Sequence, residues 1–156
     1  MAGSRDLRVL LAVDNSESSK IVTSAVAERF RPEHTEVCLL HVLEVRRTVP
    51  TSFAFARGRT YGKQLGSIMK RGYEQAADRL ARLAEVLRAE GFLVTVALAE
   101  GCPLQVILGY AERWEADLIV LGVHDRSWLD LFFKTVAEKV VREASCSVEV
   151  VRAPLG

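Results

Sequence analysis

The sequence predicts an α/β fold in which a parallel sheet of five strands is covered by helices on both faces. Apolar runs of strand length alternate with segments of helical period, an order typical of parallel sheets. Some of these runs are almost continuously apolar, as expected for strands that are buried on both faces. The 156 residues are enough for one domain with a substantial core, and we expect a single domain over residues 1–156.

Five apolar runs are expected to form the strands. Two of them, Leu7–Val13 and Asp117–Leu121, are nearly continuous and suit central positions in the sheet. The last run, Ser147–Val151, places Glu149 between two valines, an alternation typical of an edge strand. The remaining runs are Val37–Leu43 and Phe92–Leu98.

Four segments between the strands carry apolar residues at helical spacing. The first follows a start signal at Ser16, and the second is longer and ends at Gly91. The third begins at Pro103, a residue favoured in the first turn of a helix. The four apolar stripes are Ile21, Val22, Ala25, Val26 and Phe30; Ile68, Tyr73, Ala76, Ala77, Leu80, Leu83, Ala84 and Leu87; Val106, Ile107, Tyr110 and Trp114; and Val136, Val140, Val141 and Ala144.

Composition and charge narrow the class of protein. Hydrophobic residues make up 49% of the chain, charged residues 26%, and the net charge is +1, so neither a nucleic acid nor a membrane is an expected partner. No run approaches the roughly 20 apolar residues that span a membrane. The amino terminus lacks the apolar core of a secretion signal and the three cysteines are scattered. We therefore expect a cytoplasmic protein with reduced thiols and no metal site.

Residues 46–66 interrupt the alternation of strands and helices. From Arg46 to Tyr73 the chain has seven basic residues and no acidic one, and its first twenty residues have no clear period. Loops of this length inside a compact domain are usually functional or disordered. We expect a variable basic loop at 46–66 that is either solvated and mobile or an arm that folds over an anionic ligand.

Two strand ends carry residues that suit a ligand site. In an open parallel sheet, ligands bind beyond the carboxyl ends of the strands, where the strand order reverses. The first strand ends at Asp14 and the fourth at Gly122, and these residues flank one crevice if the two strands are neighbours. Asp14 either accepts hydrogen bonds from an adenine amino group or a ribose hydroxyl, or caps the following helix by binding backbone donors.

Four stretches of the chain carry motifs beyond this periodicity: VLLAVDNSESS, VCLLHVLEV, EGCPLQVILGYAERWEADLIVLG and TVAEKVVREASCSVEVVR. In this order they resemble the first strand and turn, the second strand, the G-x-P helix with its A-D-L-I-V-x-G block, and the last helix and strand of the universal stress protein family. The resemblance covers nearly the whole chain. It implies a three-layer, Rossmann-like open sheet of order 3-2-1-4-5, similar to the adenine nucleotide alpha hydrolase-like folds. It also implies a homodimer through Ser147–Arg152 and a role in the stress response.

Members of this family divide into those that bind ATP and those that do not. The binders carry G-x-x-G, nine residues and G-[ST]; the glycines let the backbone approach the phosphates, and the helix that follows adds a positive dipole end. Here Gly122 stands at the first glycine, Asp125 replaces the second, and Lys134–Thr135 replaces the final pair one residue early. A carboxylate about 4 Å from a phosphate costs roughly 1–4 kcal/mol.

We therefore expect a degenerate nucleotide site with weak or absent ATP binding and no resident cofactor. Adenosine contacts are expected at Ala12, Asp14 and Val42, where the family's adenosine-binding positions fall. No catalytic residue is expected, and the protein is predicted to act through protein partners rather than as an enzyme.

The alternative is binding of AMP, or of ATP with Mg²⁺. The phosphates would then be held by Arg126, Ser127 and Lys134–Thr135, together with the basic loop. A hydrolase or transferase activity would in addition need a catalytic base near the phosphates, and only His124 or Asp125 offers one.

Overall fold

The structure is a computed structural model that describes residues 5–44, 58–123 and 131–152, with side chains for all of these except 58–69 and 131–135. Within these residues, one parallel sheet has the order β3-β2-β1-β4-β5, which confirms the predicted fold class. Its strands are β1 (Leu7–Val13), β2 (Thr35–Leu43), β3 (Leu93–Glu100), β4 (Leu118–Val123) and β5 (Ser147–Arg152). The helices are α1 (Ser18–Arg29), a short 3₁₀ helix η1 (Pro32–His34), α3 (Gly58–Ala89), α4 (Pro103–Trp114) and α5 (Leu131–Glu143).

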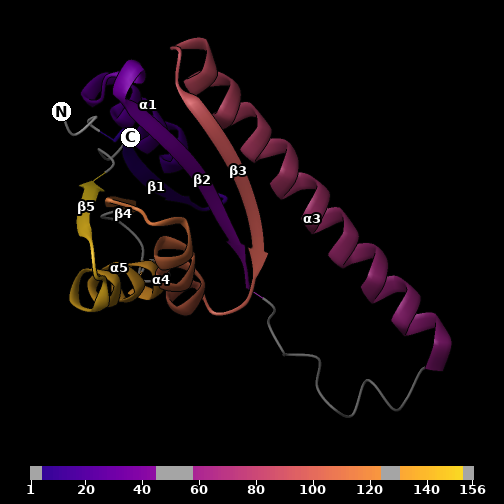
Figure 1. The fold of residues 1–156 in the computed structure, drawn as a ribbon. Helices are drawn as coiled ribbons and strands as arrows, with labels where there is room; N and C mark the ends of the chain where they lie inside the picture. Colours follow the sequence, from indigo (N-terminus) through magenta and orange to yellow (C-terminus); the bar gives the residue numbers. More distant parts are fainter. Residues whose placement is uncertain (1–4, 45–57, 124–130, 153–156) are drawn as a thin grey trace.

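Helices cover both faces of the sheet (Figure 1), with α1 and α3 on one face and α4 and α5 on the other. Successive side chains of a strand point to opposite faces. In β1, Val9 and Leu11 therefore pack against the α1/α3 layer, whereas Leu10 and Ala12 pack against the α4/α5 layer. All four are at most 7% exposed. This burial on both sides explains why the first strand is apolar throughout.

The strand order confirms which strands are central and which lie at an edge. β1 pairs in parallel with β2 on one side and with β4 on the other. Ala12 lies opposite Leu121 in register, so the carboxyl ends of β1 and β4 meet, as the ligand-site argument requires. β5 and β3 form the two edges of the sheet.

Parts of the predicted apolar stripes are wrong, because some of their residues face solvent. Ile21, Tyr73 and Val141 are 38%, 47% and 54% exposed. In α1, which begins two residues after the expected start signal, buried positions are instead filled by Ser19 and Thr23. The Thr23 hydroxyl donates to the Ser19 carbonyl oxygen at 2.6 Å. A hydroxyl that is hydrogen-bonded in this way can be buried at little cost, and apolar periodicity does not reveal it.

The expected loop at 46–66 is wrong in its second part, because α3 begins at Gly58. Figure 1 shows the first half of this helix extending past the carboxyl end of β3. Its first turns hold glycines and basic residues rather than an apolar stripe, so periodicity could not identify them. Residues 46–57 lie outside the described residues.

Asp117 ties the amino end of β4 to that of β1. Its Oδ2 accepts a hydrogen bond from the backbone N–H of Arg8 at 2.8 Å, and its Oδ1 accepts one from Arg5 Nη2 at 2.6 Å. The backbone bond from Arg8, together with the bond and charge of Arg5, lowers the pKa of Asp117 below its ordinary value. The Asp of the A-D-L-I-V-x-G block therefore has a structural role at the end of the sheet opposite the strands' carboxyl termini.

A carboxyl group with a lowered pKa in the folded state stabilises the protein above its unfolded pKa, and this contribution is lost as the pH falls through the folded value. We expect Asp117→Asn to be less stable than the wild type at pH 7, with a difference that shrinks once the pH falls below about 4. Urea unfolding at pH 7 and again below about pH 4 measures this difference in stability. Glu115→Gln is the control, because the Glu115 side chain is 73% exposed and exposed pairs contribute about 0–1 kcal/mol. An Asp117→Asn deficit of equal size at both pH values would contradict this role.

Candidate functional site

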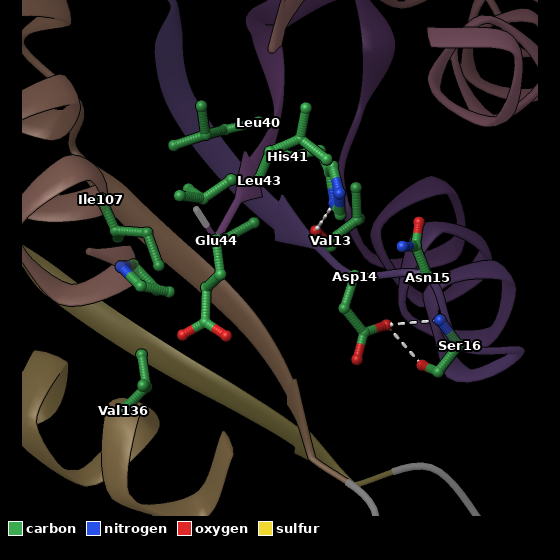
Figure 2. Close-up of a pocket in the computed structure, with 13 residues that line it drawn as sticks. Val13, Asp14, Asn15, Ser16, Leu40, His41, Leu43, Glu44, Ile107 and Val136 are labelled. Carbon is green, nitrogen blue, oxygen red and sulfur yellow. Dashed lines mark hydrogen bonds between the residues drawn. The ribbon is translucent and has the colours of Figure 1, made fainter. Parts of the chain in front are cut away.

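A cavity of about 520 Å³ opens at the carboxyl ends of β1 and β2. Figure 2 shows Ile107 of α4 and Val136 of α5 across from these strand ends. The volume is within the range of sites that hold small molecules, and such sites are mainly apolar with a few placed polar groups. The apolar residues that line it are Ala12, Val13, Leu40, Val42, Leu43, Pro103, Ile107 and Val136.

The cavity forms where the strands end at different heights. The pairing of β1 with β2 stops at Val13 and His41, whereas β2 continues to pair with β3 as far as Leu43. The last residues of β2 therefore have no neighbour from β1. Gly101, at φ 139°, lets the chain turn sharply after β3, because this conformation favours glycine. The turn places Pro103, the first residue of α4, beside the cavity.

Asp14 directly follows β1, and the next turn holds one of its carboxylate oxygens. Oδ1 accepts hydrogen bonds from the Ser16 backbone N–H and the Ser19 hydroxyl, each at 2.9 Å, and also from the Ser16 hydroxyl. Oδ2 has no hydrogen-bond partner among the described residues, and Figure 2 shows it pointing away from Ser16. One oxygen thus organises the turn before α1, and the other is available to a ligand.

The local role of Asp14 differs from a helix cap. Because α1 begins at Ser18, its N-cap residue is Glu17, which forms no side-chain capping bond. Asp14 lies three residues earlier and stabilises the turn instead, an arrangement that is common for aspartate after a strand.

His41 of β2 forms a hydrogen bond with the last residue of β1. It is 6% exposed, and its Nδ1 lies 2.8 Å from the carbonyl oxygen of Val13. A donor is required at this distance from a carbonyl, so the imidazole carries a proton on Nδ1. The bond satisfies a carbonyl group at the point where the pairing of the two strands stops. His41 therefore has a structural role at the carboxyl end of the paired strands.

Gly122 lies beside this cavity but does not line it. It shares with Asp14, Ser19 and Val22 a space of only about 10 Å³ between β4 and α1. A Cβ atom at this position would lie 2.5 Å from Cγ2 of Val22. Asp14 and Gly122 do flank one crevice, as the sequence predicted, but α1 fills it. Close packing between α1 and β4 is therefore enough to require this glycine, whether or not a ligand binds.

Most residues expected near the phosphates either lie outside the described residues or have no described side chain. His124, Asp125, Arg126 and Ser127 lie outside the described residues. Lys134–Thr135 lies in the helical backbone of α5, without described side chains. The next residue, Val136, lines the cavity, so the second turn of α5 reaches it.

Glu44 is a lining residue that the sequence argument missed. It follows the last residue of β2, is exposed, and lines the cavity together with Asp14. Among the described lining residues, these two are the charged ones, and both are acidic. The available signal was its position immediately after a predicted strand, at the end of the sheet where ligands bind.

Cys38 is part of the core and not a reactive group. It is fully buried on the α4/α5 face of the sheet. Burial raises the pKa of its thiol to about 11, and a thiol that stays protonated is a poor nucleophile. Cys102 and Cys146 are free as well, and burial raises the pKa of Cys146.

The described part of the chain shows neither a metal-binding cluster nor a membrane-spanning helix. No group of three or more His, Cys, Asp or Glu side chains there is arranged to hold a metal ion. No helix there has both the length and the apolar character needed to cross a membrane.

An open parallel sheet with a cavity beyond the carboxyl ends of its strands defines a Rossmann-like α/β protein, and the cavity lies where ligands usually bind in this class. Comparison with known families is more specific, because the universal stress protein family matches residues 7–152. The chain belongs to the universal stress protein family.

Similar proteins span almost the same length. The universal stress protein from the QAH/OAS sulfhydrylase 3′ region of Thermus aquaticus is 29% identical over 151 residues, which cover 92% of this chain and 97% of that protein. The structure of MJ0577, a universal stress protein of Methanocaldococcus jannaschii, is similar with a TM-score of 0.75 at 23% identity, covering 96% and 98% of the two chains. A family member from Arabidopsis thaliana with AMP bound has a TM-score of 0.65 at 19% identity, covering 95% and 92%. At these identities the structural likeness establishes the shared fold.

Proposed function

We propose that the protein binds the adenosine part of a ligand in this cavity, holds a triphosphate weakly or not at all, and catalyses no reaction. The observation that carries the proposal is the cavity itself, about 520 Å³ in volume, mostly apolar, and with Asp14 at one wall. An adenine ring has two apolar faces and a few polar edge atoms, which suits such a site. The Arabidopsis thaliana relative with AMP bound supports an adenine-bearing ligand.

Two of the residues expected to contact adenosine lie side by side at the cavity. Ala12 and Val42 line the cavity and lie on the α4/α5 face of neighbouring strands. They would contact one face of a flat ring, and Ile107 and Val136 would contact the other face. The free Oδ2 atom of Asp14 would accept a hydrogen bond from a ribose hydroxyl or from the adenine amino group.

Weak binding of phosphate is supported by the charge of the lining and by the sequence. Both charged side chains among the described lining residues, Asp14 and Glu44, are carboxylates. The glycine that matches the family's phosphate-binding pattern, Gly122, is required by packing against Val22. Asp125 replaces the second glycine of that pattern. A carboxylate about 4 Å from a phosphate costs roughly 1–4 kcal/mol.

A second candidate, binding of AMP or of ATP with Mg²⁺, is favoured by the position of α5. Because Val136 lines the cavity, Lys134–Thr135 is close to it along the helix. The amino-terminal turn of a helix attracts anions through its free N–H groups and its dipole. Phosphates would then be held by the start of α5.

Isothermal titration calorimetry with adenosine, AMP and ATP plus Mg²⁺ separates the two candidates. We expect adenosine to bind and ATP to bind no more tightly than adenosine. Val42→Phe, which fills the cavity, is expected to weaken adenosine binding by about tenfold or more. The matched control is Val96→Phe on β3, which is 40% exposed and does not line the cavity.

If ATP bound at least about tenfold more tightly than adenosine, the second candidate would replace the first, since the phosphates would then contribute about 1.4 kcal/mol or more. If none of the three ligands bound at about millimolar concentration, which corresponds to a binding free energy weaker than about −4 kcal/mol, both candidates would be excluded.

We also propose that the protein is a cytoplasmic homodimer that takes part in the stress response through protein partners. β5 lies at an edge of the sheet, and Val150 on it is 42% exposed. An unpaired strand edge can pair with the same strand of a second copy, which gives the two-fold symmetric contact that is common in dimers.

A further inference from the structure

The two carboxylates of the cavity bear on which adenine-containing ligands it accepts. We propose that it selects adenine nucleosides with an uncharged or positively charged 5′ substituent over those that carry a 5′ phosphate, and that Glu44 determines this selectivity. The inference rests on the proposed function, because it concerns the same cavity.

Glu44 presents a negative charge that no described residue balances. It forms no hydrogen bond or ion pair with any described residue, and it lines the cavity from the end of β2. Figure 2 shows its carboxylate extending into the same space that the Asp14 carboxylate faces, with Val136 of α5 across from it. A ligand that fills the cavity therefore lies beside both acidic groups.

Asp14 likewise forms no ion pair with a described residue. Its carboxylate accepts hydrogen bonds only from neutral donors of Ser16 and Ser19 within the described chain. Two cations reach the same turn, but neither forms an ion pair with Asp14. Lys20 pairs with Glu17 at 3.0 Å, and the guanidinium of Arg79 on α3 donates to the carbonyl oxygen of Asn15.

This arrangement favours one class of ligand. A 5′ phosphate carries between about one and a half and two negative charges at pH 7, and two carboxylates at the walls repel it. A protonated amine or a sulfonium group at the same position is attracted. Apolar walls lower the local dielectric, which strengthens both effects relative to bulk water.

Calorimetric titration of the full chain at low ionic strength with 5′-amino-5′-deoxyadenosine, adenosine and AMP tests the inference. We expect the amine, which is protonated at neutral pH, to bind most tightly and AMP least tightly. The Kd values of the amine and AMP should differ by about tenfold or more, as expected for one or two charge pairs a few ångströms apart near a surface. Added salt should reduce the difference, because it screens exposed charges.

Glu44→Gln should lower the ratio of the two Kd values by about three- to fivefold, because it removes one of the two charges. Glu100→Gln is the matched control, since Glu100 ends β3 opposite Leu43 in register but does not line the cavity. This control should leave the ratio unchanged. Circular dichroism confirms that both variants are folded, which is expected because both side chains are exposed.

The outcomes separate this inference from the proposed function. If adenosine binds and AMP binds as tightly as the amine or more tightly, the inference is overturned and the proposed function stands. An unchanged ratio in folded Glu44→Gln overturns the role of Glu44. If none of the three ligands binds, the inference and the proposed function are both overturned.

Discussion

Replacing Gly122 with alanine is expected to destabilise the folded protein by about 1–3 kcal/mol, the range for extra atoms in a close-packed site. The added Cβ would lie 2.5 Å from Cγ2 of Val22, closer than real Cβ atoms approach another heavy atom. Val22 is 1% exposed, and a valine in a helix has one strongly preferred rotamer. The contact can therefore be relieved only by moving α1 away from β4.

Gly109→Ala provides the matched control for this substitution. Gly109 lies in α4, and a Cβ atom added there meets nothing within 4 Å. Alanine is the better helix former by up to about 1 kcal/mol, so this variant should be as stable as the wild type or more stable. Urea unfolding gives both free energies.

A double-mutant cycle with Val22→Ala locates the effect. In the Val22→Ala background, Gly122→Ala should cost less than in the wild type, because the clashing methyl group is gone. A Gly122→Ala protein of wild-type stability with impaired adenosine binding would show instead that the glycine serves the ligand.

Leu40→Ala is expected to destabilise the protein by about 2–5 kcal/mol and also to weaken adenosine binding. Leu40 is fully buried, faces the α4/α5 layer and lines the cavity. The loss of its side chain removes apolar contacts from the core and from the wall of the site. If the ligand touches this wall, the lost contact of about 1 kcal/mol lowers its affinity about fivefold.

Leu39→Ala is an unusually close control, because the two leucines are neighbours in β2. Leu39 is also fully buried but faces the α1/α3 layer. Its replacement should cost a similar free energy of unfolding, again about 2–5 kcal/mol, and leave the affinity for adenosine unchanged. Unfolding and calorimetry at a temperature at which both variants are folded test this. Equal loss of affinity in both variants would show that the adenosine site is not on the α4/α5 face.

The sheet could be predicted from the sequence because its central strand β1 and the neighbouring strands β2 and β4 are largely buried. The bounds of β1 agree with the predicted run Leu7–Val13, whereas the strand order was implied by the family resemblance. The bounds of β2 and β3 differ by a few residues, since polar or small residues such as Thr35 and Ala99 continue the pairing. Apolar runs identify the buried part of a strand better than its ends.

The helices were less predictable where their contacts are not apolar. α1 buries Ser18, Ser19 and Thr23. Their hydroxyl groups form hydrogen bonds with residues that are close in sequence. The beginning of α3 has no apolar face in its sequence. In both regions hydrogen bonding and chain continuity determine the structure, and hydrophobic periodicity carries no information on them.

The candidate site could be predicted only in part. Ala12, Asp14 and Val42, the adenosine positions that the family resemblance implies, line one cavity, and their contact with adenosine stays a prediction. Glu44 could not be singled out, because one exposed acidic residue after a strand has no distinctive pattern. The role of Gly122 in packing was hidden as well, because it depends on Val22, which is distant in sequence.

A crystal structure of the protein soaked with ATP and Mg²⁺ tests most directly whether the cavity binds adenosine without holding a triphosphate. The account predicts an adenine ring against Ala12 and Val42, with Asp14 Oδ2 accepting a hydrogen bond from the ligand, and no ordered β- or γ-phosphate. A fully ordered triphosphate held at the start of α5 would contradict it.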